Sequence, residues 1–245
     1  AGVFADRPVA YQCLTGVSAN ATEIFKQTLT INAMSQAMHS MSGSSGTGNV
    51  DVYAQTRADD LVIRCIRELL ERHTELPKDK VEEVAIAATT QIGDQGLTLG
   101  RGAALLSGLP NTTPGYSIDR MCAGAMTAVT AVAGSIAMGA IDVAIAGGDE
   151  HMGRHPMGEG VDPNPRIIAE KIVDPSALVM GQTAENLHDR FPQLTKARCD
   201  AFALGSQGKL AAAYAAGKIQ PDLVSVATRH KELGYGLATV DAPPR

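Results

Sequence analysis

Cys122 has the strongest chemical context in this 245-residue chain. It follows a strand-like segment, residues 114–121, and opens a helix-like segment of small residues, 122–139. A side chain at such a junction points out of the end of a sheet, beside the first unpaired amide groups of the helix. Those amides and the helix dipole favour a negatively charged sulfur and can hold a developing oxyanion. The segment therefore predicts a cysteine nucleophile that attacks a thioester.

A buried, inert thiol is the competing interpretation of Cys122, because free cysteine is among the most buried residue types. The local pattern leaves both interpretations open. Cys65 lies within an apolar helix-like segment and is expected in the core, whereas Cys13 and Cys199 have no chemical context. The four cysteines form no CxxC pair, so neither a zinc knuckle nor a disulfide framework is expected.

The elements that would position Cys122 alternate between strands and helices. Strand-like segments occupy residues 81–90, 114–121 and 141–150, and helix-like segments occupy 57–72, 100–107 and 122–139. Short connections between them favour right-handed βαβ crossovers and a parallel sheet, so the fold class is expected to be α/β. Thr56 is the candidate N-cap of the first of these helices.

The chain divides by composition into three parts. Residues 1–52 are an unassigned N-terminal segment that ends in a Gly/Ser-rich linker, 42–49. Residues 53–150 carry the α/β alternation, and residues 151–245 are expected to be mostly helical, with one helix at 196–216. The linker lacks the Lys-Ser/Thr pair of a phosphate-binding loop.

Charge and hydropathy exclude several classes of partner. The formal net charge is −5, which argues against binding to nucleic acid or to an anionic membrane surface. The sequence has no apolar run of the roughly 18 residues that a membrane span requires. The first residues lack the basic and apolar blocks of a secretory signal. The four cysteines lie far apart in the sequence, so a reducing, cytoplasmic compartment is expected.

Three ordered motifs resemble those of one enzyme family. They are residues 119–126 (DRMCAGAM), 142–152 (DVAIAGGDEHM) and 180–186 (MGQTAEN). They are similar to the thiolase motifs Asn-Arg-x-Cys-x-Ser-Gly, Ala-Gly-Gly-x-Glu-x-Met-Ser and Met-Gly-x-Thr-Ala-Glu. The chain is thus identified as the N-terminal half of a thiolase with its loop domain. This resemblance implies a thiolase-like layered α/β fold, with the N-terminal core at 53–150 and a CoA-covering, mostly helical loop domain at 151–245.

The resemblance also implies an activity, that of an acetyl-CoA C-acyltransferase. Cys122 would take the acyl group of an acyl-CoA, and a second thioester would condense with it in a Claisen reaction. The reverse reaction is thiolytic cleavage of a 3-ketoacyl-CoA, a step of fatty acid and lipid metabolism. Met180 would line the acyl pocket. The expected ligands are coenzyme A thioesters as substrates, with no resident cofactor and no metal.

Departures from the family pattern leave two readings of function open. The Asn-Glu-Ala-Phe, Gly-His-Pro and Cys-Gly-Gly-Gly motifs of the second thiolase half are not found in the sequence. His155 superficially resembles the Gly-His-Pro histidine, but it directly follows the Gly-Gly turn and is expected to be a loop residue. The chain is therefore either an acyltransferase or a truncated, non-catalytic subunit with a structural or assembly role. In both cases we expect a homo-oligomer or a complex with a second thiolase half, because half of the layered fold leaves an apolar face uncovered.

Overall fold

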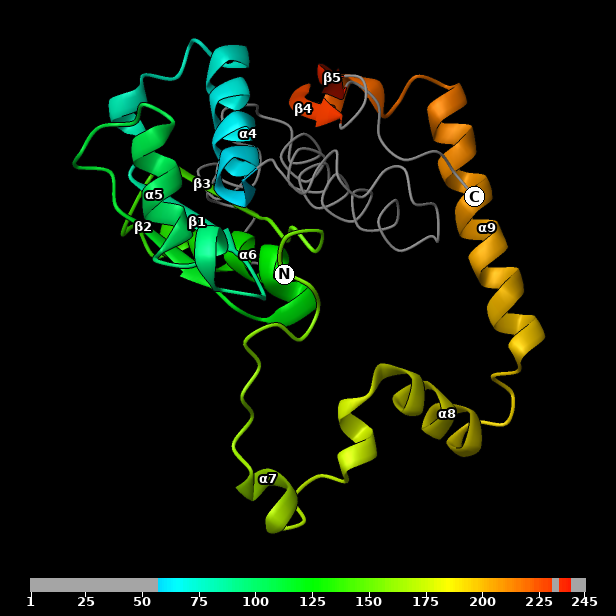
Figure 1. Cartoon of the computed structure of the whole chain (residues 1–245). Coiled ribbons are helices and arrows are strands. Elements are labelled where there is room, and N and C mark those ends of the chain that lie inside the picture. Colours follow the sequence, from blue (N-terminus) through cyan, green and yellow to red (C-terminus); the bar gives the residue numbers. More distant parts are fainter. Residues whose placement is uncertain (1–56, 231–233, 239–245) are drawn as a thin grey trace. The chain divides into compact units, whose positions relative to one another are not determined.

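The computed structural model describes residues 57–230 and 234–238. The first described part of the chain folds into alternating helices and strands (Figure 1): α4 (Ala58–Arg72), β1 (Glu83–Ala87), α5 (Leu99–Leu106), β2 (Gly115–Ile118), α6 (Gly124–Ala137) and β3 (Ala144–Gly148). The later elements are α7 (Arg166–Ala169), α8 (Met180–Arg190), α9 (Lys196–Ala215), β4 (Val226–His230) and β5 (Gly234–Ala238). Within the described ranges, no helix combines the length and apolarity that crossing a bilayer requires.

The three-stranded sheet has the order β2-β1-β3, and β1 pairs with both neighbours in parallel. Val84, Ala85 and Ile86 of β1 are fully buried, because helices cover both faces of the central strand. Such a doubly covered strand reads as a continuous apolar run in sequence. The parallel sheet confirms the α/β fold class that the alternation predicted.

Side chains that alternate along the strands divide the core into two layers. Val84 and Ile86 pack on one face with α4 and α5, in a cluster that includes Ile66 and Leu99. Ala85 faces the other side and packs against α6. This layer combines alanines with Val132 and Ile136 of α6.

A contact between two glycines brings α5 against β2. A Cβ atom on Gly100 would lie 2.2 Å from the carbonyl oxygen of Tyr116 and 2.8 Å from that of Val84. A Cβ on Gly115 would lie 2.6 Å from the carbonyl carbon of Gly100. Neither position has room for a side chain, so both glycines are required for the packing of this helix on the sheet.

The structure refines several of the predicted elements. The helix predicted at 57–72 is confirmed as α4, although Arg57 occupies its N-cap position and Thr56 lies outside the described residues. The helix predicted from residue 122 begins instead at Gly124, because residues 121–123 form a 3₁₀ turn. The helix predicted at 196–216 is confirmed as α9, and Gly217 follows it with a positive φ of 66°.

The antiparallel pair of β4 and β5 was not predicted. Their sequences, VATRH and GYGLA, carry no apolar alternation long enough to identify a strand. The N-terminal segment expected at 1–52, with its linker, lies outside the described residues.

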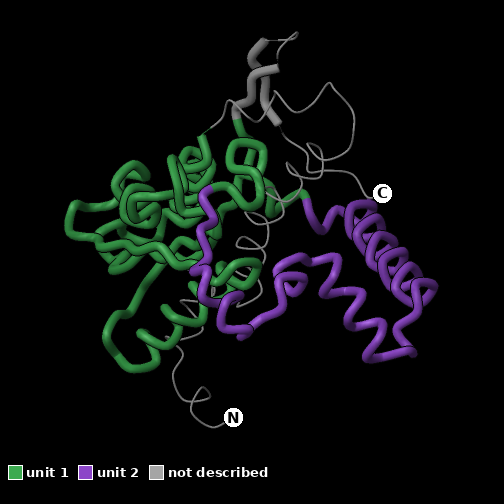
Figure 2. The backbone as a smooth tube through the Cα atoms, turned by 60° about the horizontal axis from the view of Figure 1, so that its bottom comes forward, with its two compact units in different colours: residues 1–159, 220–242 green, residues 160–219, 243–245 purple. Residues whose placement is uncertain are grey.

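The chain separates into two compact units (Figure 2). The described part of the first unit runs from residue 57 to Glu159 and resumes at Gln220, and the second unit covers Gly160–Ile219. The second unit holds α7, α8 and α9, and none of its described residues is buried. Its helices are defined by local interactions, such as the Thr195 hydroxyl that caps α9 by accepting from the Arg198 amide.

Candidate functional site

The carboxyl ends of the three parallel strands meet at one edge of the sheet. In the register, Ala87 of β1 is opposite both Ile118 of β2 and Gly148 of β3. The alignment continues beyond the strands, since the amide of Ala88 donates to Ile118 O at 3.1 Å and that of Asp149 donates to Ala87 O at 2.8 Å. The segments that follow the strands therefore start side by side, in the position where open α/β sheets bind ligands.

Cys122 lies in the turn between β2 and α6 and is exposed. The Asp119 carboxylate shapes this turn by accepting a hydrogen bond of 2.8 Å from the Met121 amide. Met121 itself has a φ of +47°, a left-handed conformation that is uncommon for a residue other than glycine and often found at functional sites. The buried-thiol interpretation of Cys122 is therefore wrong, whereas the predicted position between strand and helix is confirmed.

The amides that follow Cys122 are already engaged in the 3₁₀ turn. Ala123 N donates to Arg120 O at 3.1 Å, and Gly124 N donates to Met121 O. No side chain caps the N-terminus of α6. In this conformation the Ala123 and Gly124 amides do not offer the oxyanion site expected for the first helix amides, because the local turn satisfies them first.

The start of α6 packs closely against the ends of β1 and β3. A Cβ on Gly124 would lie 2.9 Å from the Cβ of Ala87. A Cβ on Gly148 would lie 3.0 Å from the Cβ of Ala125 and 3.2 Å from Ala87 O. Small residues at these positions therefore place the turn of Cys122 directly above the edge of the sheet.

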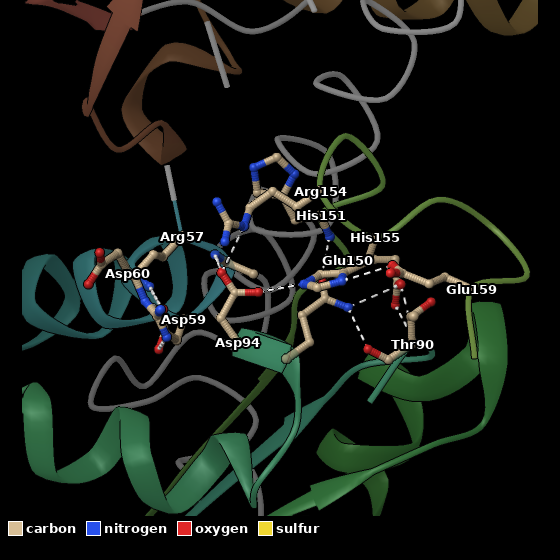
Figure 3. Close-up of polar contacts among 12 residues, drawn as sticks. Arg57, Asp59, Asp60, Thr90, Asp94, Glu150, His151, Arg154, His155 and Glu159 are labelled. Atoms are coloured by element: carbon tan, nitrogen blue, oxygen red, sulfur yellow. Dashed lines mark hydrogen bonds and ion pairs between the residues drawn. The ribbon is translucent and has the colours of Figure 1, made fainter. Parts of the chain in front are cut away.

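Glu150 ties the segment after β3 to the segment after β1 (Figure 3). Its carboxylate accepts from Thr89 N at 2.6 Å and from Thr90 N at 3.2 Å, and Gln95 Nε2 donates to it at 3.2 Å. The buried Gln95 also accepts from His151 N at 2.5 Å through its side-chain oxygen. One carboxylate thereby satisfies the amide groups of two residues that follow the buried strand β1.

A second cluster surrounds Asp94 (Figure 3). Its carboxylate accepts from His155 Nε2 at 2.5 Å and from the Ala58 amide at 3.0 Å, which caps α4 from a distant part of the sequence. Arg154 Nε lies 2.9 Å from the same carboxylate. Burial alone would raise the pKa of Asp94, but the hydrogen bonds from His155 and Ala58 and the charge of Arg154 together lower this pKa below its ordinary value.

His155 is held on both sides of its ring. Besides the contact with Asp94, its Nδ1 lies 3.1 Å from Glu159 Oε2. Two carboxylates thus occupy both ring nitrogens, which leaves neither nitrogen to accept a proton from a cysteine. The geometry supports the prediction that His155 is a loop residue.

Two buried titratable groups lie in the interior beneath this edge. Burial and the neighbouring charge of Glu150 raise the pKa of Asp149 well above its ordinary value, and one of its carboxylate oxygens has no hydrogen-bond partner. Burial, followed by the charge of Asp149, raises the pKa of the Cys65 thiol to about 12. Cys65 is therefore a buried core residue, as predicted.

Met180 begins α8 in the second unit, and its side chain is exposed. Cys122 belongs to the first unit, so the two predicted site residues lie in different compact bodies of the chain. Cys199, for which no role was predicted, is an exposed residue of α9.

Asp94, Gln95 and Glu150 were not predicted from the sequence as residues of the site. A usable signal was present for Glu150, which is the last residue of the strand-like segment predicted at 141–150. Asp94 and Gln95 follow the end of β1 by several residues. Polar side chains after parallel strands converge at the same edge, so their position in the chain indicated a shared environment.

Comparison with known proteins places these features in context. Residues 32–242 match the family model described as "Thiolase, N-terminal domain". A 3-ketoacyl-CoA thiolase from Psychrobacter cryohalolentis is 37% identical over 191 residues, which are 78% of this chain and 48% of that protein. A beta-ketoadipyl-CoA thiolase from Pseudomonas putida is 37% identical over 194 residues, with 73% and 48% coverage.

A solved structure gives a similar result. The crystal structure of the Bacillus anthracis acetyl-CoA acetyltransferase aligns with a TM-score of 0.63 at 26% identity. The alignment covers 79% of this chain and 50% of that structure. The chain therefore spans about half the length of the relatives that it matches.

Proposed function

Because the chain belongs to the thiolase family, we propose that it carries the acyl-accepting cysteine of a thiolase-type acyltransferase. One observation carries the proposal: Cys122 is an exposed thiol in a left-handed turn at the carboxyl edge of a parallel sheet. A thioester could approach this thiol without rearrangement of the core. The substrates proposed are acyl-CoA thioesters.

In the proposed first step, the Cys122 sulfur attacks the thioester carbonyl of an acyl-CoA. The new carbon–sulfur bond replaces the bond to coenzyme A, and the thiol proton leaves with the released coenzyme A. In the second step, an acyl-CoA deprotonated at its α-carbon attacks the acyl-cysteine and yields a 3-ketoacyl-CoA. Thiolysis is the reverse of this sequence and would belong to fatty acid metabolism.

Residues 1–245 contain the proposed nucleophile, whereas the resemblance assigns the motifs that activate it to the second half of a thiolase. A missing general base costs typically ~10²–10⁴-fold in rate. We therefore propose that residues 1–245 alone support slow acylation of Cys122. Condensation and thiolysis would require the groups of the second half.

Mass spectrometry of the intact protein tests this proposal. After incubation with acetyl-CoA or acetoacetyl-CoA, one acetyl group should be added and should map by peptide digestion to Cys122. Cys122→Ser should abolish the adduct, and Cys199→Ser is the matched control because it removes another exposed thiol. If wild type and Cys122→Ser carry the same label, the acyltransferase reading is wrong and the non-catalytic subunit reading takes its place.

We also propose that another polypeptide covers the outer face of α6. Met126 on this helix and Met138 at its end are 60% and 79% exposed, next to the exposed Thr130 and Ala131. The partner proposed is a second thiolase half or a further copy of the chain. Size-exclusion chromatography with light scattering should give a mass above 25.5 kDa, and a strictly monomeric mass would contradict self-association.

Two finer assignments are part of the same proposal. Met180 would line the acyl pocket, so Met180→Ala should change the preferred acyl chain length without preventing acylation of Cys122. A cytoplasmic location is supported by the three described cysteines, which are free thiols and so suit a reducing compartment. Fractionation of cells that express the tagged protein would test the location.

A further inference from the structure

The turn that carries Cys122 is attached to β1 at two points. The carbonyl oxygen of Ile118, where β2 ends, accepts a hydrogen bond of 3.1 Å from the Ala88 amide. Gly124, where α6 begins, packs so closely against Ala87 that a Cβ on the glycine would lie 2.9 Å from the Cβ of Ala87. Both ends of the turn therefore take their position from the exit of β1.

The exit of β1 is in turn fixed by the Glu150 carboxylate (Figure 3). β1 ends at Ala87, and the amides of the next residues but one, Thr89 and Thr90, donate to Glu150 at 2.6 Å and 3.2 Å. Gln95 Nε2 donates to the same carboxylate at 3.2 Å and to Thr90 O at 2.9 Å. A carboxylate suits this position because it accepts several hydrogen bonds and presents no donor of its own.

The backbone on both sides of Glu150 is held as well. The Asp149 amide donates to Ala87 O at 2.8 Å, and the His151 amide donates to the side-chain oxygen of Gln95 at 2.5 Å. Gln95 is fully buried, so this second bond is shielded from water. Glu150 thus presents its carboxylate from a backbone that is bonded to β1 and to the segment after it.

A second glutamate makes the same kind of contact at the opposite edge of the sheet. Glu82 directly precedes β1, and its carboxylate accepts from the Asp142 and Val143 amides at 2.5 Å and 3.2 Å. These two residues precede β3, at the amino edge of the sheet. Because Cys122 lies at the carboxyl edge, Glu82 is a matched control for Glu150.

We propose that Glu150 is a positioning residue, whose carboxylate fixes the exit of β1 and thereby the placement of the turn that carries Cys122. This inference rests on the function proposed for Cys122. A thiol attacks a thioester efficiently only from a defined position, and a displacement of about 1 Å can cost about 10²-fold in rate. The path from Glu150 through Thr89 and Ala88 to Ile118 is continuous, as coupling through a packed network requires.

The rate of Cys122 acylation by acetyl-CoA, followed by intact mass, tests the proposal. Glu150→Ala should be acylated about 10–100-fold more slowly than wild type. Glu150→Gln has nearly the same volume but turns an amide donor toward the Gln95 and Thr90 donors, so its rate should lie between those of Glu150→Ala and wild type. Glu82→Ala should retain the wild-type rate, because it loosens the edge away from Cys122.

Sodium formate separates the role of the carboxylate from that of packing. Formate can enter the space that alanine leaves at position 150 and accept from the Thr89 and Thr90 amides, so it should raise the rate of Glu150→Ala by about fivefold or more. Sodium chloride at the same ionic strength should not raise this rate. A wild-type rate in Glu150→Ala would overturn the proposal. So would a slowed variant that formate does not restore, because lost packing would then explain the effect.

Hydrogen exchange of the turn separates this proposal from the function proposed for Cys122. In Glu150→Ala, the Ala123 and Gly124 amides should exchange about tenfold faster than in wild type, and formate should slow them again. Their exchange in Glu82→Ala should match wild type. Unchanged exchange in Glu150→Ala would overturn the role of Glu150. If wild type is not acylated, the function proposed for Cys122 is wrong, and the exchange rates still decide whether Glu150 holds the turn.

Discussion

The α/β region, residues 57–159, and the helical region, Gly160–Ile219, differ in whether their helices bury apolar side chains. Helices α4, α5 and α6 each bury an apolar side against the sheet, whereas α8 and α9 bury no residue. Phe202 and Leu204 of α9 are 81% and 73% exposed. Tertiary packing therefore stabilises the first set of helices, and local caps and ion pairs stabilise the second.

This difference bears on function. The exposed Cys122 is placed by a packed framework, in which Gly124 and Gly148 fit against Ala87. The proposed acyl-pocket residue, Met180, lies in the region without a buried core. A precise position for Met180 would thus depend on further contacts, such as those with substrate or with a partner.

The same substitution in the two regions should have opposite effects, and this is the largest contrast that we expect. Gly100→Ala places a Cβ 2.2 Å from Tyr116 O and should destabilise the fold by about 3–5 kcal/mol. Gly205→Ala in α9 meets no atom within 4 Å and should stabilise the helix by about 0.5–1 kcal/mol. Denaturation of the first variant and hydrogen exchange in α9 of the second would measure the two effects. Stability changes of the same sign in the two variants would contradict the distinction between the regions.

Truncation of apolar side chains should also affect the two regions differently, although the two changes in unfolding free energy should differ by less. Ile86→Ala empties a position that is 1% exposed and should cost about 3–4 kcal/mol of unfolding free energy. Leu204→Ala, at 73% exposure, should change stability by less than about 0.5 kcal/mol. Urea denaturation followed by circular dichroism gives both values. A large loss in Leu204→Ala would reveal packing of α9, for example in an oligomer.

The buried carboxyl of Asp149 should have a pH-dependent effect of intermediate size on the free energy of unfolding. Because the pKa of Asp149 is raised in the folded protein, its carboxyl ionises at a lower pH in the unfolded state. The folded state therefore loses stability as pH rises from about 4 through the pKa of the folded protein. Asp149→Asn should therefore raise the free energy of unfolding at pH 7 by about 1–2 kcal/mol, and this gain should vanish below about pH 4. Urea denaturation curves at several pH values provide the measurement.

Asp200→Asn in α9 is the matched control for Asp149→Asn. Its carboxylate is exposed and paired with Lys196, so the substitution should change stability by less than about 0.5 kcal/mol. If Asp149→Asn destabilises the protein at neutral pH, the carboxyl has a stabilising partner and the assignment of an unfavourable buried acid is wrong.

The smallest expected effect concerns the local interactions of the helical region. Thr195→Ala removes the side chain that accepts from the Arg198 amide at 3.3 Å and should cost about 0.5–1 kcal/mol of helix stability. The loss should be confined to the first turns of α9, and hydrogen exchange would localise it. Unchanged exchange there would mean that contacts other than the cap stabilise α9.

Sequence patterns predicted the layers of the fold because burial on both faces of β1 requires a continuous apolar run. They also located Cys122 between a strand and a helix. They did not reveal the left-handed turn at Met121, since an ordinary methionine gives no sign of a positive φ. The shorter observed strands, such as Glu83–Ala87 within the predicted 81–90, reflect apolar residues that continue beyond the paired backbone.

Sequence patterns could not predict the clusters around Asp94 and Glu150, for a physical reason. His155 and Asp94 are 61 positions apart, and their contact depends on the sheet register rather than on local spacing. A single sequence contains the side chains of such a pair but not their pairing. Only the rule that polar groups gather after parallel strands could have suggested a common location.

The central position of β1 also has a consequence for the order of events during folding. Both of its partner strands are reached through helical crossovers, and the amide of Thr89 pairs with a carboxylate that lies 61 positions later in the chain. Such non-local pairs form slowly, because chain entropy is lost before the contacts compensate for it. During synthesis, Cys122 emerges before the strand that completes the edge beside it. The edge of the sheet that carries the exposed Cys122 thiol is thus among the last parts of the core to form.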